Sequence, residues 1–205
     1  MTTTSPAPSL TGTDPRPAFT SAVGLLLGTA AAVRPDQLGA PTPCTELDVQ
    51  ALLGHVLHVL RRIATAGRGA DIDSTPRVVE RPAEGWPQAL EAAAADLAGV
   101  WADDRVLDAV LRLPFGTLPG RAALATWVGE VTTHTWDLAV ATGHSPAWDD
   151  AVAAVGLAAI LGKLPAAGRG PGIPFADAVP VPDDAPAVER LVAWQGRDPR
   201  WTPPA

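Results

Sequence analysis

A chain of 205 residues is long enough to form a domain with its own hydrophobic core, and its 47% of hydrophobic residues exclude a chain that is disordered throughout. Fifteen Lys and Arg residues against 22 Asp and Glu residues leave a net charge of −7, which repels phosphate groups and excludes nucleic acid as an expected partner. The single cysteine, Cys44, excludes an internal disulfide, as expected for a protein of the reducing cytoplasm.

The N-terminal segment predicts neither export nor a membrane anchor. A secretory signal needs a basic and an apolar region, and both are absent from MTTTSPAPSLTGTDPRPAFT. No apolar run elsewhere in the chain is long enough to span a membrane. Residues 1–14 are rich in Thr, Ser and Pro, so we predict a disordered tail there. We therefore expect a cytoplasmic protein that makes no contact with a membrane.

Apolar residues recur at helical spacing through residues 15–164, which we predict to form a helical bundle. The predicted helices cover residues 17–33, 47–65, 86–102, 121–142 and 149–162. Between residues 105 and 120 we predict a short helix or strand, followed by a turn at Phe115 and Gly116. Several amphipathic helices with few strands favour an all-α bundle.

The segment 165–205 differs in composition from the helices before it. Proline alternates with apolar residues through most of this segment, which predicts an extended strap because proline interrupts both helices and sheets. Helical spacing of apolar residues returns at 187–194, where we predict a short helix. We expect the strap and this helix to pack on the bundle.

Two histidines of the predicted helix 47–65 lie on different faces. His55 has Leu52 about one turn before it and Val59 one turn after it, which places it on the apolar face. His58 has Arg62 one turn after it, so we expect His58 to be exposed to solvent, with a place at the mouth of a pocket as the alternative.

Glu130 and His134 lie one turn apart on the predicted helix 121–142, on a face that they share with Trp127 and Leu138. A carboxylate that faces the interior of a bundle is costly unless it is paired or binds a metal. Adding His55 from a facing helix gives two imidazoles and one carboxylate, a ligand set that suits Zn, Ni or Fe(II). Three protein ligands leave a coordination position open, which is typical of catalytic metal sites.

Simpler interpretations exist for each half of this set. A Glu and a His four residues apart are common as a surface ion pair, and a single histidine on an apolar face is usually a core residue with a hydrogen-bond partner. The combination of both features on faces that point inward is what favours a metal site over these alternatives.

Four stretches of the sequence carry a family resemblance. They are VRPDQLGAPTPCTELDVQALLGHVL, LRLPFGTLPGRAAL, EVTTHTWDLAVATGH and GRGPGIPFADAVPVPDDAPAVERLVAWQGRDP. In this order they resemble actinobacterial metal-binding proteins of the DinB/YfiT-like superfamily, which are similar to the N-terminal domain of mycothiol-dependent maleylpyruvate isomerase. The resemblance covers nearly the whole chain after about the first fifteen residues. It implies an up-down-down-up four-helix bundle with a divalent metal, most simply Zn or Ni, bound by His55, Glu130 and His134.

The chain also departs from the family pattern. Members often have Asn before the histidine of the second helix, where this chain has Gly54, and Trp where this chain has Leu47. The larger isomerase also carries a C-terminal domain, and this chain is too short to hold a full one, so we expect that its isomerase activity does not carry over.

The resemblance implies a mycothiol-dependent transferase or isomerase that acts on a small electrophile, with mycothiol as a cosubstrate. Two alternatives stay open: a thiol-independent metal-dependent hydrolase or tailoring enzyme, and a non-enzymatic bundle that binds a metal or another ligand. The expected partners are a small-molecule substrate and a low-molecular-weight thiol, and both a monomer and a homodimer fit the sequence.

Three further residues are candidates for the site. Asp137, three residues after His134, is placed either to orient a metal ligand or to complete a local polar network. Arg169, in the Gly-rich part of the strap, is a candidate to close over an anionic substrate. Cys44 precedes a helix whose dipole would lower the pKa of its thiol, but a structural, partly buried role is the preferred interpretation.

Overall fold

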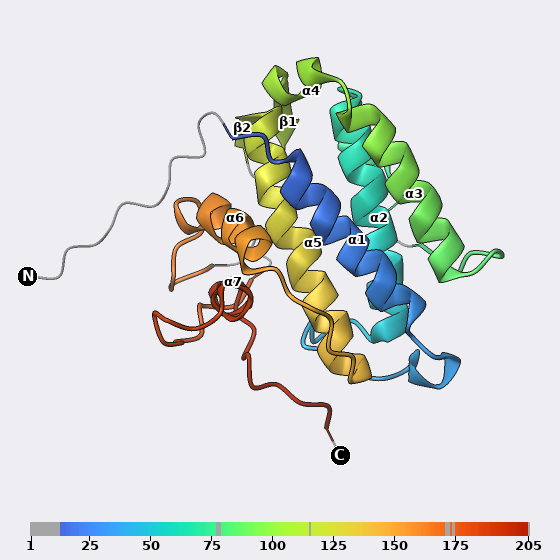
Figure 1. Ribbon diagram of the computed structural model, residues 1–205, viewed down its shortest axis with the longest axis vertical. Coiled ribbons are helices and arrows are strands. Elements are labelled where there is room, and N and C mark those ends of the chain that lie inside the picture. The colour runs from blue at the N-terminus through green and yellow to red at the C-terminus, as the bar shows by residue number, and fades with distance from the viewer. Residues whose placement is uncertain (1–12, 77–78, 115, 171–172, 174, 205) are drawn as a thin grey trace, which may run out of the picture.

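The computed structural model describes residues 13–76, 79–114, 116–170, 173 and 175–204 (Figure 1). The described helices are α1 (Arg16–Ala31), α2 (Val49–Gly67), α3 (Trp86–Trp101), α4 (Asp104–Asp108), α5 (Gly120–Thr142), α6 (Asp150–Leu161) and α7 (Ala187–Trp194), with short 3₁₀ turns η1 (Pro35–Gln37) and η2 (Ile72–Ser74). The mostly-α fold predicted from the sequence is confirmed. None of the described helices is long and apolar enough to cross a membrane.

The four longest helices, α1, α2, α3 and α5, lie side by side (Figure 1). In this group α1 and α5 run in one direction and α2 and α3 run in the other. Each helix contributes leucines that are completely buried, among them Leu26, Leu57, Leu90 and Leu124. The apolar periodicity of the sequence therefore faces one shared core, as the sequence predicted.

Helix α5 is buried on almost all sides because α1, α2, α6 and α7 pack against it. It ends where the sequence predicted, at Gly143, whose φ of 68° ends the helix in the left-handed conformation that glycine adopts without strain. Helix α6 crosses α5 closely, since a Cβ atom on Gly156 would lie 2.5 Å from the Cα atom of Gly129. Helix α6 thus packs directly against the backbone of α5 at Gly129, next to Glu130.

The segment between α3 and α5 contains both a helix and strands. After α4, strands β1 (Val110–Leu113) and β2 (Gly116–Pro119) form an antiparallel hairpin in which Val110 pairs with Pro119. The sequence left a helix and a strand as alternatives for this segment, and the hairpin partner strand was not predicted. The predicted turn includes Phe115, which lies outside the described residues.

The C-terminal segment contains helix α7, at the residues where a short helix was predicted. Val188, Leu191 and Val192 of α7 form a second small core with Trp136 of α5. Residues 1–12 of the predicted tail lie outside the described part of the chain. The domain boundaries proposed from the sequence therefore stay predictions.

Candidate metal centre

Helices α2 and α5 bring the three predicted metal ligands together, although 79 residues separate His55 from His134. The Nε2 atom of His55 lies 3.2 Å from the Nε2 atom of His134. The Oε1 atom of Glu130 lies 3.3 Å from Nε2 of His134 and 3.8 Å from Nε2 of His55. Each side chain thus offers one donor atom to a common point.

The spacing of these donor atoms fits a divalent cation. Zn²⁺ binds His nitrogen and carboxylate oxygen at about 2.0–2.1 Å, so donors around a tetrahedral ion lie about 3.4 Å apart. The three separations here, 3.2, 3.3 and 3.8 Å, are close to that value. Two imidazoles and a carboxylate suit Zn²⁺ and Ni²⁺ alike. The residues present therefore fit the predicted metal.

The cluster is closed on one side and open to solvent on the other. The side chain of His134 is 8% exposed, whereas those of Glu130 and His55 are 27% and 34% exposed. The cluster therefore borders solvent on the side of Glu130 and His55. This accessibility is typical of a catalytic site rather than a closed structural one.

A close tertiary contact explains why a glycine precedes His55. A Cβ atom on Gly54 would lie 2.8 Å from the backbone oxygen of Val79 and 3.5 Å from the ring of Trp86. The chain at Val79 therefore passes too close to α2 for a side chain such as Asn at this position. The departure from the family pattern has a packing reason.

Asp137 holds the far side of the His134 ring. Its Oδ2 atom lies 3.0 Å from Nδ1 of His134, and its side chain is completely buried. The Nη2 and Nε atoms of Arg197 donate to Oδ2 and Oδ1 of the same carboxylate at 3.0 and 3.3 Å. Because an ionised carboxylate only accepts hydrogen bonds, Nδ1 of His134 must carry a proton, which directs Nε2 toward His55 and Glu130.

The charges of this network stabilise one another. Burial by itself would raise the pKa of Glu130 and of Asp137. Hydrogen bonds from His134 and His55 nevertheless hold the pKa of Glu130 below its usual value, and a hydrogen bond from His134 with the charge of Arg197 lowers that of Asp137. Burial by itself would lower the pKa of His134, but Asp137 and Glu130 raise that pKa to about 9. In the metal-free protein His134 is therefore a cation between two carboxylates.

Cys44 lies beside this network, with its Sγ atom within 4.8 Å of donor atoms of His134 and Asp137. Burial raises the pKa of the Cys44 thiol, against the effect of the nearby charge of Arg197. Cys44 is partly buried, as the preferred interpretation expected. The alternative, a pKa lowered by a helix dipole, is wrong because α2 begins only at Val49 and desolvation dominates. Cys44, His134 and Asp137 could in principle form a second metal site. The positive charge of Arg197 on Asp137 makes binding of a metal ion there unfavourable.

His58 is not exposed as the sequence predicted. Its side chain is buried, and its ring centre lies 6.4 Å from that of His55. The neighbouring Arg62 misled the prediction, because a long arginine side chain carries its charge to solvent from a half-buried position. His58 is thus a buried neighbour of His55 on α2.

Arg169 also has a different environment from the one expected. Its guanidinium donates to the backbone oxygens of Pro165 and Trp194, each at 2.7 Å, and to that of Ala176. Its backbone N–H donates to the carboxylate of Asp177. These contacts brace the strap against the end of α7, and the structure offers no support for a substrate contact by Arg169.

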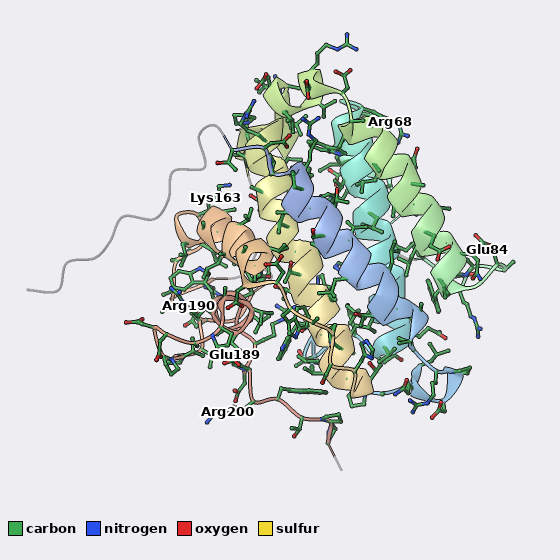
Figure 2. All side chains as sticks on the ribbon, in the orientation of Figure 1. Arg68, Glu84, Lys163, Glu189, Arg190 and Arg200 are labelled. Atoms are coloured by element: carbon green, nitrogen blue, oxygen red, sulfur yellow. The ribbon has the colours of Figure 1, made fainter. Side chains whose placement is uncertain are left out.

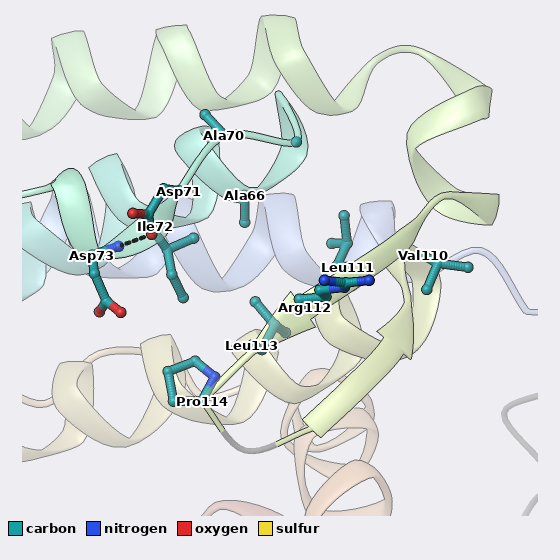
Figure 3. Close-up of a pocket in the computed structure, with 11 residues that line it drawn as sticks. Ala66, Ala70, Asp71, Ile72, Asp73, Val110, Leu111, Arg112, Leu113 and Pro114 are labelled. Carbon is teal, nitrogen blue, oxygen red and sulfur yellow. Dashed lines mark hydrogen bonds between the residues drawn. The ribbon is translucent and has the colours of Figure 1, made fainter.

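A pocket of about 650 Å³ lies away from the cluster, between the C-terminal end of α2, η2 and β1 (Figure 3). Asp71 and Arg112 are among the residues that line it. Because a helix rises about 1.5 Å per residue, Ala66 at the edge of this pocket lies about 16 Å along α2 from His55. The pocket therefore does not contain the candidate metal centre.

Comparison with known proteins identifies the family of the chain. The sequence profile of the mycothiol maleylpyruvate isomerase N-terminal domain matches residues 19–139, more than half of the chain. The chain belongs to this family. It is also 38% identical over 186 residues to two uncharacterized proteins of Mycobacterium tuberculosis, MT0763 of strain CDC 1551 and Rv0738 of strain H37Rv, which covers 90% of this chain and 98% of each relative. No solved structure matches the chain.

The match to the mycothiol maleylpyruvate isomerase N-terminal domain contains the three donor residues and Asp137, but it ends before Arg197. Arg197 is the member of the network that was not predicted from the sequence. It stands in the motif WQGRDP, which contributed to the family resemblance, but no local spacing relates it to Asp137. The sequence carries no signal for this contact, because His134 already offers Asp137 a partner on its own helix.

We expect the affinity of this centre for Zn²⁺ to rise with pH. A metal at Nε2 of His134 has to displace the proton that the ring holds below its pKa of about 9. For this proton, the apparent affinity should rise by up to about tenfold per pH unit from about pH 7 and level off above about pH 9. Competition titrations with a chelator across this range check the slope, and an affinity that is flat between pH 7 and 9 would contradict the assignment of His134 as a ligand.

Proposed function

We propose that this chain binds one divalent metal ion, Zn²⁺ or Ni²⁺, through His55, Glu130 and His134. The observation that carries the proposal is the convergence of their three donor atoms at separations of 3.2–3.8 Å, on a side that solvent reaches. The opposed directions of the helix pairs α1/α5 and α2/α3 support a four-helix bundle of the DinB/YfiT type as the scaffold (Figure 1).

We further propose that the bound metal serves a thiol-dependent reaction, in which a low-molecular-weight thiol such as mycothiol is transferred to a small electrophile or assists its isomerisation. The family to which the chain belongs is named for a mycothiol-dependent isomerase, and this supports a thiol cosubstrate. A divalent metal supplies positive charge that stabilises the anionic form of a thiol.

The protein residues have separable tasks in this proposal. His134 is held by Asp137 on its Nδ1 side, so its Nε2 lone pair is available once the second proton has left. Glu130 stays ionised and contributes negative charge beside the two imidazoles. Cys44 does not act as the nucleophile, because burial keeps its thiol protonated. The attacking thiol is therefore a separate molecule that enters from the open side.

The test is an activity assay with Zn²⁺-loaded protein, mycothiol and a panel of small electrophiles. We expect the electrophile to be consumed only when both thiol and metal are present. The Glu130→Gln variant should show no such consumption. The matched control is Glu84→Gln, because Glu84 is exposed at the outer surface (Figure 2) and belongs to no part of the cluster. Turnover without thiol would replace this proposal with a metal-dependent hydrolase, and metal binding without any turnover would replace it with a binding protein.

A further inference from the structure

The end of α7 is built to return the chain toward α5. After Trp194 the N–H of Gly196 donates to the oxygen of Ala193, and the N–H of Arg197 donates to the oxygen of Val192, both at 3.0 Å. This pair of bonds is the Schellman arrangement, which requires a left-handed residue after the cap. Gly196 supplies it with a φ of 83°.

The strap makes this turn specific for glycine. A Cβ atom on Gly196 would lie 2.7 Å from the backbone oxygen of Ala176, so no other residue fits here without moving the strap. The hydrophobic contacts of Leu191 and Val192 with Trp136 hold α7 against the same turn of α5 that carries Asp137. The rigid turn after α7 therefore places Arg197 against Asp137.

The guanidinium of Arg197 pairs with the carboxylate of Asp137. Its side chain is 9% exposed, and burial of a charge is costly unless the charge is paired and hydrogen-bonded. Nε and Nη2 bind the two oxygens of Asp137, while Nη1 donates to the backbone oxygen of Gln195 at 3.1 Å. A two-point contact of this kind fixes the plane of the carboxylate as well as its position.

We propose that Arg197 is a positioning residue of the metal centre and acts through Asp137 on His134. This inference rests on the proposed metal site. It makes the C-terminal segment, which lies beyond residues 19–139 matched by the family, a component of that site. Arg197 fixes the carboxylate plane of Asp137, whose Oδ2 atom holds Nδ1–H of His134 and thereby the ring orientation. Nε2 of His134 then faces His55 and Glu130 without a search among ring rotamers.

Lysine cannot replace arginine in this role. A lysine ammonium has a single nitrogen and offers a point charge rather than a planar fork, so it leaves the carboxylate plane of Asp137 free to rotate. Arg197→Lys therefore separates charge from orientation. The matched control is Arg200→Gln, which removes an arginine three residues away that points outward (Figure 2) and pairs with Asp198 at the surface.

The experiment measures Zn²⁺ affinity by competition with a chelator, on variants whose circular dichroism matches the wild type. We expect Arg197→Gln to weaken binding by about 10–100-fold, as is usual for residues that orient a metal ligand, and Arg197→Lys to weaken it by a smaller factor. Arg200→Gln should bind like the wild type. Wild-type affinity in Arg197→Gln would overturn the proposal, and if that variant does not fold, wild-type affinity in Arg197→Lys would do so.

A double-mutant cycle separates action through Asp137 from a general effect of α7. If Arg197 acts through Asp137, Arg197→Gln should weaken Zn²⁺ binding much less in an Asp137→Asn background than in the wild type. Equal losses in the two backgrounds would show that Arg197 acts by another route, and would overturn the proposal.

Nuclear magnetic resonance of the metal-free protein keeps this inference distinguishable from the proposed function. In the wild type the Nδ1 proton of His134 should give a slowly exchanging signal, because Asp137 accepts from it in a buried site. Arg197→Gln should weaken or remove that signal, and an unchanged signal would overturn the positioning role. A wild type that binds no Zn²⁺ but shows this dependence would end the proposed function and leave the link between Arg197 and His134 standing.

Discussion

Replacing His134 with alanine is expected to weaken Zn²⁺ binding by more than about 100-fold, beyond the 10–100-fold loss that is typical for residues outside the ligand set. The reason is the position of Nε2, which lies within 3.3 Å of the donor atoms of both His55 and Glu130. Elemental analysis should find one equivalent of metal in the wild type and none in His134→Ala. His55→Ala should behave in the same way.

The matched control for this prediction is His144→Ala, which removes an exposed histidine just beyond the end of α5. It should keep the metal content and the affinity of the wild type. A His134→Ala protein that retains one tightly bound equivalent would show that the three donor atoms do not hold the metal. Both the metal site and the proposed reaction would then have to be abandoned.

Replacing Asp137 with alanine is expected to destabilise the metal-free protein by about 3–5 kcal/mol, the usual cost of removing one partner of a buried ion pair. The side chain of Asp137 is completely buried, and its loss leaves the guanidinium of Arg197 without an anion in the interior. It also leaves Nδ1 of His134 without an acceptor. Urea unfolding of the metal-free variant, compared with the wild type at the same pH, measures the difference in free energy of unfolding.

Two further variants show whether this loss comes from the unpaired charge. Asp198→Ala removes a carboxylate that pairs with Arg200 at the surface, and we expect no measurable change in unfolding because solvent screens such a pair. The double variant Asp137→Leu with Arg197→Met removes both buried charges and should recover much of the lost stability. If Asp137→Ala unfolds at the urea concentration of the wild type, the ion pair contributes nothing to the fold.

The main helices and the pairing of Glu130 with His134 could be predicted from the sequence because they depend on local geometry. A helix repeats every 3.6 residues, so apolar spacing alone located α1, α2, α3 and α5 to within a few residues. The same period is enough to place Glu130 and His134 on one face of α5. Placing His55 in the site needed the further assumption of a facing helix in a bundle. Such a helix brings Nε2 of His55 within 3.2 Å of Nε2 of His134, 79 positions away.

Residues whose environment depends on distant segments could not be predicted in this way. His58 was expected in solvent, but the burial of a position on α2 depends on which other elements cover that helix. Arg169 was expected near a substrate, but its guanidinium donates to backbone oxygens of the strap and of α7. In both cases the neighbours along the chain carried no information about the neighbours in space.

The sequence by itself therefore determined the mostly-α fold, the helix ends set by residues such as Gly143, and the chemical composition of the candidate site. Only the tertiary structure decided that Arg197 reaches Asp137 across 60 positions and that burial raises the pKa of the Cys44 thiol. The physical reason is the range of the interactions. Helix periodicity and capping act within a few residues, whereas burial and ion pairing depend on which distant segments the whole chain packs together.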